Sequence, residues 1–371
     1  MKTKTIMMLL CLSITGAAQG QKINLLIGTY THTGKSEGIY VYDFDTNTGK
    51  VTLKNQVTVV DPSFLTISPD RKFAYSVSEL GEGKGALSAF AFDEQTGRLT
   101  LLNTQLTQSA GPCHVAINPG VNHAFVSNYS GGSLTVFPIH KDGKLGELVQ
   151  LIQYEGSGPD KNRQQAPHVH SAFFSPDEKT VYVQDLGTDK INIYHYHPEH
   201  TDKPLTPAAQ PVVKSAPGGG PRHIAPSSDG KYLYLVQEMT AHLMVYKQEE
   251  DRWVSIQEIA MNESGFTGKD GAADIKLSPD GKFLYASNRG DANTLAIYRV
   301  NTADGKLTKV GNQSVLGKGP RNFTLSPDGK FLLVANQNTD EVVVFARDAN
   351  TGLLEDTGNR IAVGAPVCLV F

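Results

Sequence analysis

SPDGKFLYASNR, residues 278–289, is the clearest copy of a unit that recurs along the whole chain. Pro and Gly mark a tight turn, and the alternating apolar residues around it predict a β-hairpin. Successive turns are separated by 48–57 residues. A repeat of about 50 residues with four strands in each unit is typical of a β-propeller. Besides Asp280, the turn residues are Asp70, Gly120, Asp177, Asp229 and Asp328.

The first repeat is divided between the two ends of the chain. Apolar runs at 24–30, 38–44 and 51–59 predict three strands, but no hairpin precedes the first of them. The missing strand lies at 365–371, so the C-terminus is expected to complete the N-terminal sheet and to remove two exposed edges. Six internal hairpins and this composite sheet predict an all-β fold. It is a seven-bladed β-propeller, last blade closed by the N- and C-terminal strands together.

The N-terminus has the pattern of a signal peptide. Lys2 and Lys4 precede an apolar run at 6–14 and small residues at 16–20, which predicts removal of residues 1–20. Residues 21–371 are then expected to form a single propeller domain that is exported to the periplasm. No later segment is apolar and long enough to span a bilayer, so no membrane insertion is expected after processing. The oligomeric state cannot be read from the sequence.

Composition narrows the class of partner. The formal net charge is −3, whereas a protein that binds nucleic acid needs a basic face, so no nucleic-acid partner is expected. After processing only Cys113 and Cys368 remain, near the starts of inner strands in non-adjacent repeats. Export permits disulfides, but this separation predicts two buried free thiols instead.

One rim of the predicted ring varies from blade to blade. In each repeat the first strand begins, and the second ends, on the rim opposite the Ser-Pro-Asp-Gly turns, because neighbouring strands are antiparallel. When the repeats are aligned on their turns, equivalent positions on this rim carry different charged groups, which would converge around the axis to form a site. The alternative is that they are ordinary solvated surface residues. The candidate catalytic residues are His170, Arg222, Glu238 and Arg289. The candidate substrate-binding residues are His168, His223, Asn128, Asp185, Asp274 and Arg321.

Two segments are longer than the repeat requires. They are a polar loop at 156–167 and a Pro-rich insertion at 195–217, and long loops on a rigid scaffold often carry function. The insertion contains His195, His197 and His200, which are too few ligands for a metal site. The insertion is therefore predicted to be solvated, and neither a metal nor another cofactor is expected.

Several short motifs fall in these same regions. They are IGTYT at 27–31, GIYVY at 38–42, RQ at 163–164, PHVHS at 167–171, GPRH at 220–223, SNRG at 287–290 and GPRNF at 319–323. Together they resemble the seven-bladed propeller lactonases, which include the propeller type of 6-phosphogluconolactonase and the fungal 3-carboxy-cis,cis-muconate lactonizing enzyme. The resemblance covers nearly all of the mature chain. It implies a lactone hydrolase of carbohydrate metabolism with a small-molecule lactone substrate. The implied catalytic patch falls on His170, Arg222, Arg289 and Glu238. The signal peptide departs from the cytosolic members and leaves open whether the substrate is phosphorylated.

Opening a lactone requires an activated water molecule and stabilisation of charge on the carbonyl oxygen. No Gly-x-Ser-x-Gly motif supplies a serine nucleophile, so a base acting on water is expected. We assign the base to Glu238, the acid to His170, and oxyanion or carboxylate binding to Arg222 and Arg289. The roles of Glu238 and His170 are interchangeable at this point.

Two other functions stay open. One is a muconate-type cycloisomerase, in which the arginine pair would hold the carboxylates of an unsaturated diacid. The other is a non-enzymatic propeller that binds a protein or glycan on the same rim, because the architecture alone proves no catalysis. The mixed charged cluster favours an enzyme, since binding rims typically present larger aromatic and apolar anchors.

Overall fold

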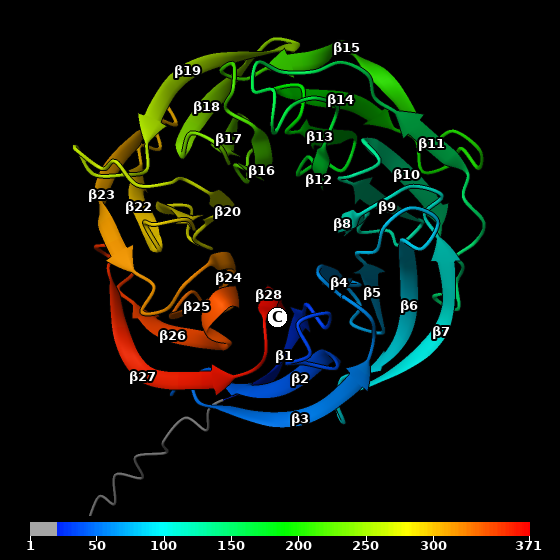
Figure 1. Ribbon diagram of the computed structural model, residues 1–371, viewed down its shortest axis with the longest axis horizontal. Coiled ribbons are helices and arrows are strands. Elements are labelled where there is room, and N and C mark those ends of the chain that lie inside the picture. The colour runs from blue at the N-terminus through cyan, green and yellow to red at the C-terminus, as the bar shows by residue number, and fades with distance from the viewer. Residues whose placement is uncertain (1–20) are drawn as a thin grey trace, which may run out of the picture.

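The computed structural model describes residues 21–371, which form seven four-stranded antiparallel sheets arranged in a ring (Figure 1). The predicted all-β, seven-bladed propeller is therefore confirmed. The predicted signal peptide, residues 1–20, lies outside the described part of the chain. Among residues 21–371, no helix is long and apolar enough to cross a membrane.

Each blade is named here from its innermost strand outward. Blade 1 contains β28 (Pro366–Val370), β1 (Lys22–Thr29), β2 (Gly38–Asp45) and β3 (Val51–Thr58). Blade 2 contains β4 (Leu65–Ile67), β5 (Phe73–Ser78), β6 (Ala86–Asp93) and β7 (Arg98–Leu106). Blade 3 contains β8 (Pro112–Ile117), β9 (His123–Asn128), β10 (Ser133–Pro138) and β11 (Gln150–Gln153). Blade 4 contains β12 (Val169–Phe174), β13 (Thr180–Asp185), β14 (Lys190–Tyr196) and β15 (Leu205–Lys214).

The remaining blades follow the same plan. Blade 5 contains β16 (Pro221–Pro226), β17 (Tyr232–Gln237), β18 (His242–Glu249) and β19 (Arg252–Ala260). Blade 6 contains β20 (Ala272–Leu277), β21 (Phe283–Asn288), β22 (Thr294–Val300) and β23 (Leu307–Ser314). Blade 7 contains β24 (Pro320–Leu325), β25 (Phe331–Asn336), β26 (Glu341–Arg347) and β27 (Leu354–Ala362), with the 3-10 helix η1 (Gln337–Thr339) after β25.

The Ser-Pro-Asp-Gly turns join the two inner strands of a blade through the same side-chain bonds. In blade 6 the Ser278 hydroxyl donates to Asp280 at 2.5 Å and accepts the N–H of Phe283 at 3.0 Å. The Asp280 carboxylate in turn accepts the N–H of Lys282 at 3.1 Å. The serine hydroxyl thus links the strand before the turn to the aspartate of the turn and to the backbone of the strand after it, which fixes the turn. The same bonds recur from Ser68, Ser175, Ser227 and Ser326.

The turns between the outer strands connect one blade to the next. Gly352, at φ +76°, packs against the Phe283 ring so closely that an added Cβ would lie 2.3 Å from it. Its carbonyl accepts a hydrogen bond of 2.8 Å from the Tyr285 hydroxyl in the preceding blade. Only glycine combines a left-handed conformation with this close approach. Equivalent tyrosine bonds join Tyr75 to Gly143 and Tyr234 to Gly305.

Two details of the sequence prediction need separate comment. Cys113 and Cys368 are both buried free thiols, as expected. The insertion at 195–217 is not a wholly solvated loop, because its residues Leu205–Lys214 form β15, the outer strand of blade 4. Its five prolines and its polar residues concealed this strand, which lies at a sheet edge where proline is tolerated.

The composite blade 1 closes the ring, as predicted (Figure 1). β28 pairs with β1 in antiparallel register, with Leu26 opposite Val370 and Ile27 opposite Leu369. Leu369 is 3% exposed and packs with Ile27 and with Leu333 of blade 7. The pairing therefore supplies both backbone hydrogen bonds and part of the apolar contact between the first and last blades.

Deletion of residues 365–371 should abolish cooperative folding, because it unpairs β1 and opens the blade 1–blade 7 core. We expect the truncated protein to be insoluble or to lack a thermal transition by circular dichroism. Deletion of Phe371 alone, which follows β28, is the matched control and should keep a cooperative transition. A 365–371 deletion that melts like the full chain would disprove the structural role of the closure.

Candidate active site

β-bulges on the innermost strands direct side chains toward the axis of the ring. In six blades the pairing between the first strand and its neighbour skips at least one residue. A bulged residue has no ladder partner, so its side chain can be re-aimed without breaking the sheet. The skipped residues are Cys113, His170, Arg222, Ala273 with Asp274, Arg321 and Val367.

Glu238, directly after β17, is surrounded by three guanidinium groups. Its Oε2 lies 3.0 Å from Arg222 Nε and 3.1 Å from Arg289 Nη2, and its Oε1 lies 2.6 Å from Arg163 Nη2. Arg222 is the bulged residue of β16, and Arg289 follows β21 in the next blade. The structure thus brings together three of the four predicted catalytic residues.

Arg163 is a site residue that the sequence analysis did not select. It comes from the polar loop at 156–167, and its backbone N–H is held by Asp160 at 3.0 Å. The neighbouring Gln164 is fully buried and donates to Asp189 at 2.7 Å and to the Leu186 carbonyl at 2.8 Å. The length of this loop and its RQ motif were the available signals, but neither belongs to the repeat that selected the other residues.

The arginines keep Glu238 ionised despite its burial. Burial alone would raise the pKa of this carboxyl, but Arg289, Arg222 and Arg163 outweigh it and lower the pKa to about 2. Burial and the neighbouring arginines also lower the pKa of Arg289 to about 10, against the opposing pull of Glu238. Arg222 is further anchored by a 2.6 Å bond from Nη1 to the Ala273 carbonyl.

His170, the bulged residue of β12, is held neutral beside this cluster. Burial and the positive charge of Arg222 lower its pKa well below the usual histidine range. The Tyr129 ring packs edge-on against it with centroids 5.6 Å apart, and His168 stacks on the same tyrosine at 4.5 Å. The Nδ1 atom of His170 is buried and has no hydrogen-bond partner. A neutral imidazole in this position can accept a proton.

Arg321, a predicted binding residue, belongs to a second network beside the first. Its Nη2 donates to the Tyr30 hydroxyl at 2.8 Å, and that hydroxyl donates to Glu79 at 2.8 Å. Tyr30 and Glu79 were not selected from the sequence, although Glu79 and Tyr129 follow their turns by the same number of residues as Glu238 and Arg289. With Arg163, Arg222 and Arg289, these two networks hold four guanidinium groups and two carboxylates, Glu238 and Glu79, so the networks themselves carry an excess of positive charge.

The other predicted binding residues are engaged in the frame of the site. Asp274 lies 3.0 Å from His223 Nδ1, and it also accepts from Asn322 at 2.7 Å. Burial and Arg222 lower the pKa of His223 to about 4. Asp185 accepts the backbone N–H of His168 at 2.8 Å, which fixes the start of β12. Asn128 donates to Ser133 and Thr135 inside its own blade, so these hydrogen bonds fix the strands that carry the rim.

Glu238→Gln should lower the free energy of unfolding by about 3 kcal/mol, because it leaves three guanidinium groups without their carboxylate. The fall in the Glu238 pKa from 4.5 to about 2 corresponds to a stabilisation of similar size. This stabilisation is complete above pH 4.5 and is lost as the pH falls toward 2. Urea unfolding at pH 7 and at pH 3 measures the difference.

Glu258→Gln, at an exposed position of β19, is the matched control and should change stability little. An equal effect of the two substitutions at pH 7 would contradict the electrostatic account of Glu238. So would a Glu238→Gln defect that stays constant between pH 7 and pH 3.

Comparison with known proteins identifies the family of the chain. Residues 24–371 match the model of the lactonase family with a seven-bladed β-propeller. The chain is 34% identical to the 6-phosphogluconolactonase of Bacillus subtilis, covering 93% of this chain and 97% of the relative. It is also 34% identical to that of Formosa agariphila, covering 91% and 96%. The solved structure of the periplasmic gluconolactonase of Pseudomonas aeruginosa superposes with a TM-score of 0.90 at 39% identity, covering 95% and 99%. The chain therefore belongs to the seven-bladed β-propeller lactonase family, as a 6-phosphogluconolactonase-like lactonase.

Proposed function

We propose that the chain hydrolyses a sugar-type lactone on the rim formed by His170, Glu238 and the four arginines. The observation that carries the proposal is a neutral, buried His170 beside a cluster of guanidinium groups. Such a pair of features supplies a proton acceptor for water and fixed positive charge for the developing oxyanion. The 6-phosphogluconolactonases and the gluconolactonase among the relatives support a sugar lactone as the substrate.

His170 suits the role of base better than Glu238. Both oxygens of Glu238 are paired with arginines, whereas no hydrogen-bond partner occupies Nδ1 of His170. Glu238 then orients the guanidinium groups and balances their charge. His170 therefore takes the role of base that was first assigned to Glu238, an exchange that the sequence had left open.

The reaction proceeds in two steps. In the first, His170 takes a proton from water as the water oxygen bonds to the carbonyl carbon, and an arginine stabilises the oxyanion. In the second, the bond between that carbon and the ring oxygen breaks. The imidazolium of His170 returns its proton to the ring oxygen, giving a hydroxy acid that releases a proton to solvent.

Among the arginines, Arg289 is the better placed to meet the carbonyl oxygen. Both Arg289 and Arg222 bond to Glu238 and to backbone carbonyls, but the side chain of Arg289 is 19% exposed, whereas that of Arg222 is 3% exposed. Arg163 and Arg321 add to the positive field of the rim. An anionic lactone is therefore favoured over a neutral one.

His170→Gln should reduce kcat/KM for glucono-1,5-lactone or its 6-phosphate by about 100- to 10,000-fold, because it removes the proton acceptor. The thermal midpoint should change little, since a neutral side chain of similar reach replaces a neutral imidazole. His140→Gln, at an exposed position on the opposite rim, is the matched control. Near wild-type hydrolysis by folded His170→Gln would remove His170 from the mechanism.

The pH profile of the wild-type enzyme is the second readout of the same hypothesis. Because its folded-state pKa is lowered, His170 stays in the neutral, base form as the pH falls from 7.5 to 5.5. We therefore expect kcat/KM to be flat across this range. A kcat/KM that rises steadily as the pH falls would instead indicate that a protonated His170 is required, which is the acid role.

A screen of substrates separates the lactonase from the cycloisomerase. A wild-type protein that is inactive on all lactones but active on an unsaturated diacid would favour the cycloisomerase.

The protein is proposed to act after export to the periplasm. The lysines, apolar run and small residues of 1–20 have the order of a signal peptide, and the similar Pseudomonas aeruginosa protein is periplasmic by its description. Intact-mass measurement on the periplasmic fraction should give a chain that begins near residue 21. A cytosolic product that retains Met1 would refute export.

A further inference from the structure

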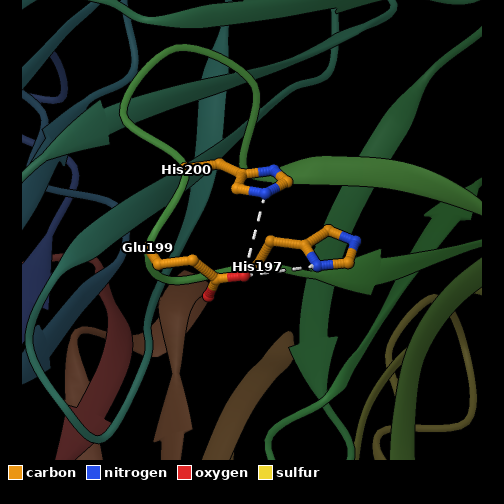
Figure 2. A group of neighbouring side chains, drawn as sticks. All are labelled: His197, Glu199 and His200. Carbon is orange, nitrogen blue, oxygen red and sulfur yellow. Dashed lines mark ion pairs between the residues drawn. The ribbon is translucent and has the colours of Figure 1, made fainter.

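The loop after β14 brings three metal-ligating side chains together. The residues are His197, Glu199 and His200, and Figure 2 shows the Glu199 carboxylate beside the two imidazole rings, with an ion pair to each. The backbone N–H of His200 bonds to the His197 carbonyl at 3.1 Å, which closes a turn with Pro198 at its second position. Proline pre-sets the backbone dihedral that this turn position requires. The arrangement is therefore built into the local sequence.

The potential ligand atoms of the three side chains lie close together. Glu199 Oε1 lies 3.8 Å from His197 Nδ1 and 3.7 Å from His200 Nε2, and the potential ligand atoms of the three residues all lie within 4.8 Å of one another. The two imidazole rings are stacked, with centroids 4.7 Å apart and planes inclined by 19°. Rotation of the exposed Glu199 and His200 side chains, which takes the His200 ring out of the stack, brings the three atoms to the separations found around one tetrahedral ion.

A further contact orients one of the ligands. His197 Nε2 lies 3.0 Å from the Thr206 hydroxyl on β15, across the strand pair. A hydrogen bond at one ring nitrogen of a histidine fixes the ring and leaves the other nitrogen for a metal. The contact of His197 Nε2 with Thr206 thus directs Nδ1 toward Glu199 and His200.

We propose that His197, Glu199 and His200 bind a zinc-class divalent transition-metal ion, with water completing its coordination. Two imidazole nitrogens and one carboxylate oxygen suit zinc and its neighbours in the transition series, whereas Mg²⁺ and Ca²⁺ prefer sites made entirely of oxygen. From the sequence, the candidate ligands were the imidazoles of His195, His197 and His200. In the structure Glu199 takes the place that His195 was given.

The ion lies on the rim opposite Glu238. β14 begins with Lys190 opposite Asp185, beside the active rim, and ends with Tyr196 near Thr180, beside the Ser-Pro-Asp turn. The ion therefore holds the loop between β14 and β15, which is closed by the bond from His197 N–H to the Pro204 carbonyl at 2.8 Å. Its binding should stabilise the fold without taking part in hydrolysis.

The test is isothermal titration of tag-free protein with Zn²⁺, because a polyhistidine tag would bind the ion itself. We expect one ion per chain and a higher thermal midpoint with Zn²⁺, and no such effect with Mg²⁺ or Ca²⁺. Thr206→Val, which keeps the shape of the side chain and removes the hydroxyl, should weaken binding by about 10- to 100-fold. His197→Ala, Glu199→Gln and His200→Ala should weaken it more.

His195→Gln is the matched control, because His195 lies on β14, directly before the loop but outside the cluster, and this variant should bind Zn²⁺ like the wild type. Absence of Zn²⁺ binding by the wild-type chain would overturn the proposal. Binding that survives His197→Ala combined with His200→Ala, or that is lost in His195→Gln, would place the ion elsewhere and would overturn it equally.

Discussion

The pairing of β28 with β1 is the constraint on which the rest of the ring depends. Without β28, β1 would be an unpaired edge strand, and an open ring would leave blades 1 and 7 without a partner face. The closure also reaches the active rim. The Tyr30 N–H, directly after β1, bonds to the Ala365 carbonyl directly before β28, and the Tyr30 hydroxyl meets Arg321 of blade 7. The pairing that joins the ends of the chain therefore also places Tyr30 beside Arg321 in the site.

Electrostatics on the rim follows from a balance between burial and charge. Taking a carboxylate out of water opposes its ionisation, yet three arginines around Glu238 reverse the effect, and the same positive charge keeps His170 unprotonated. One set of guanidinium groups thus holds an anion and a neutral base side by side. The surplus of positive charge remains available to a ligand.

Most of the fold was predictable because each repeat carries the same turn residues and the same alternation of apolar residues. The Ser-Pro-Asp-Gly turns recur because their serine and aspartate make the same hydrogen bonds in each blade. The outer-turn glycines Gly143, Gly305 and Gly352 recur because each lies against an aromatic ring of the preceding blade. His170 and Arg222 were found because equivalent positions in the repeats carry different groups, and the structure shows why: these residues are bulged. Whether they act in catalysis stays a proposal.

Other parts of the site were not predictable from the repeat. Arg163 lies on an insertion, so no alignment of blades includes it, and Tyr30 reaches the rim only because distant ends of the chain meet. Asp185 and Asn128 stand at aligned positions, but hydrogen bonds that no sequence pattern encodes direct their side chains into the frame. The outer strand β15 was hidden by prolines that an edge strand accepts.

The bulges on the innermost strands also have an evolutionary consequence. A residue without a ladder partner can be exchanged while the strands on either side keep their register, so each blade offers one nearly independent position for change. Cys113 and Val367 already occupy two of these positions with side chains that carry no charge. A lineage can therefore alter the chemistry of the rim one blade at a time, while selection on folding acts mainly on the turns at the opposite rim.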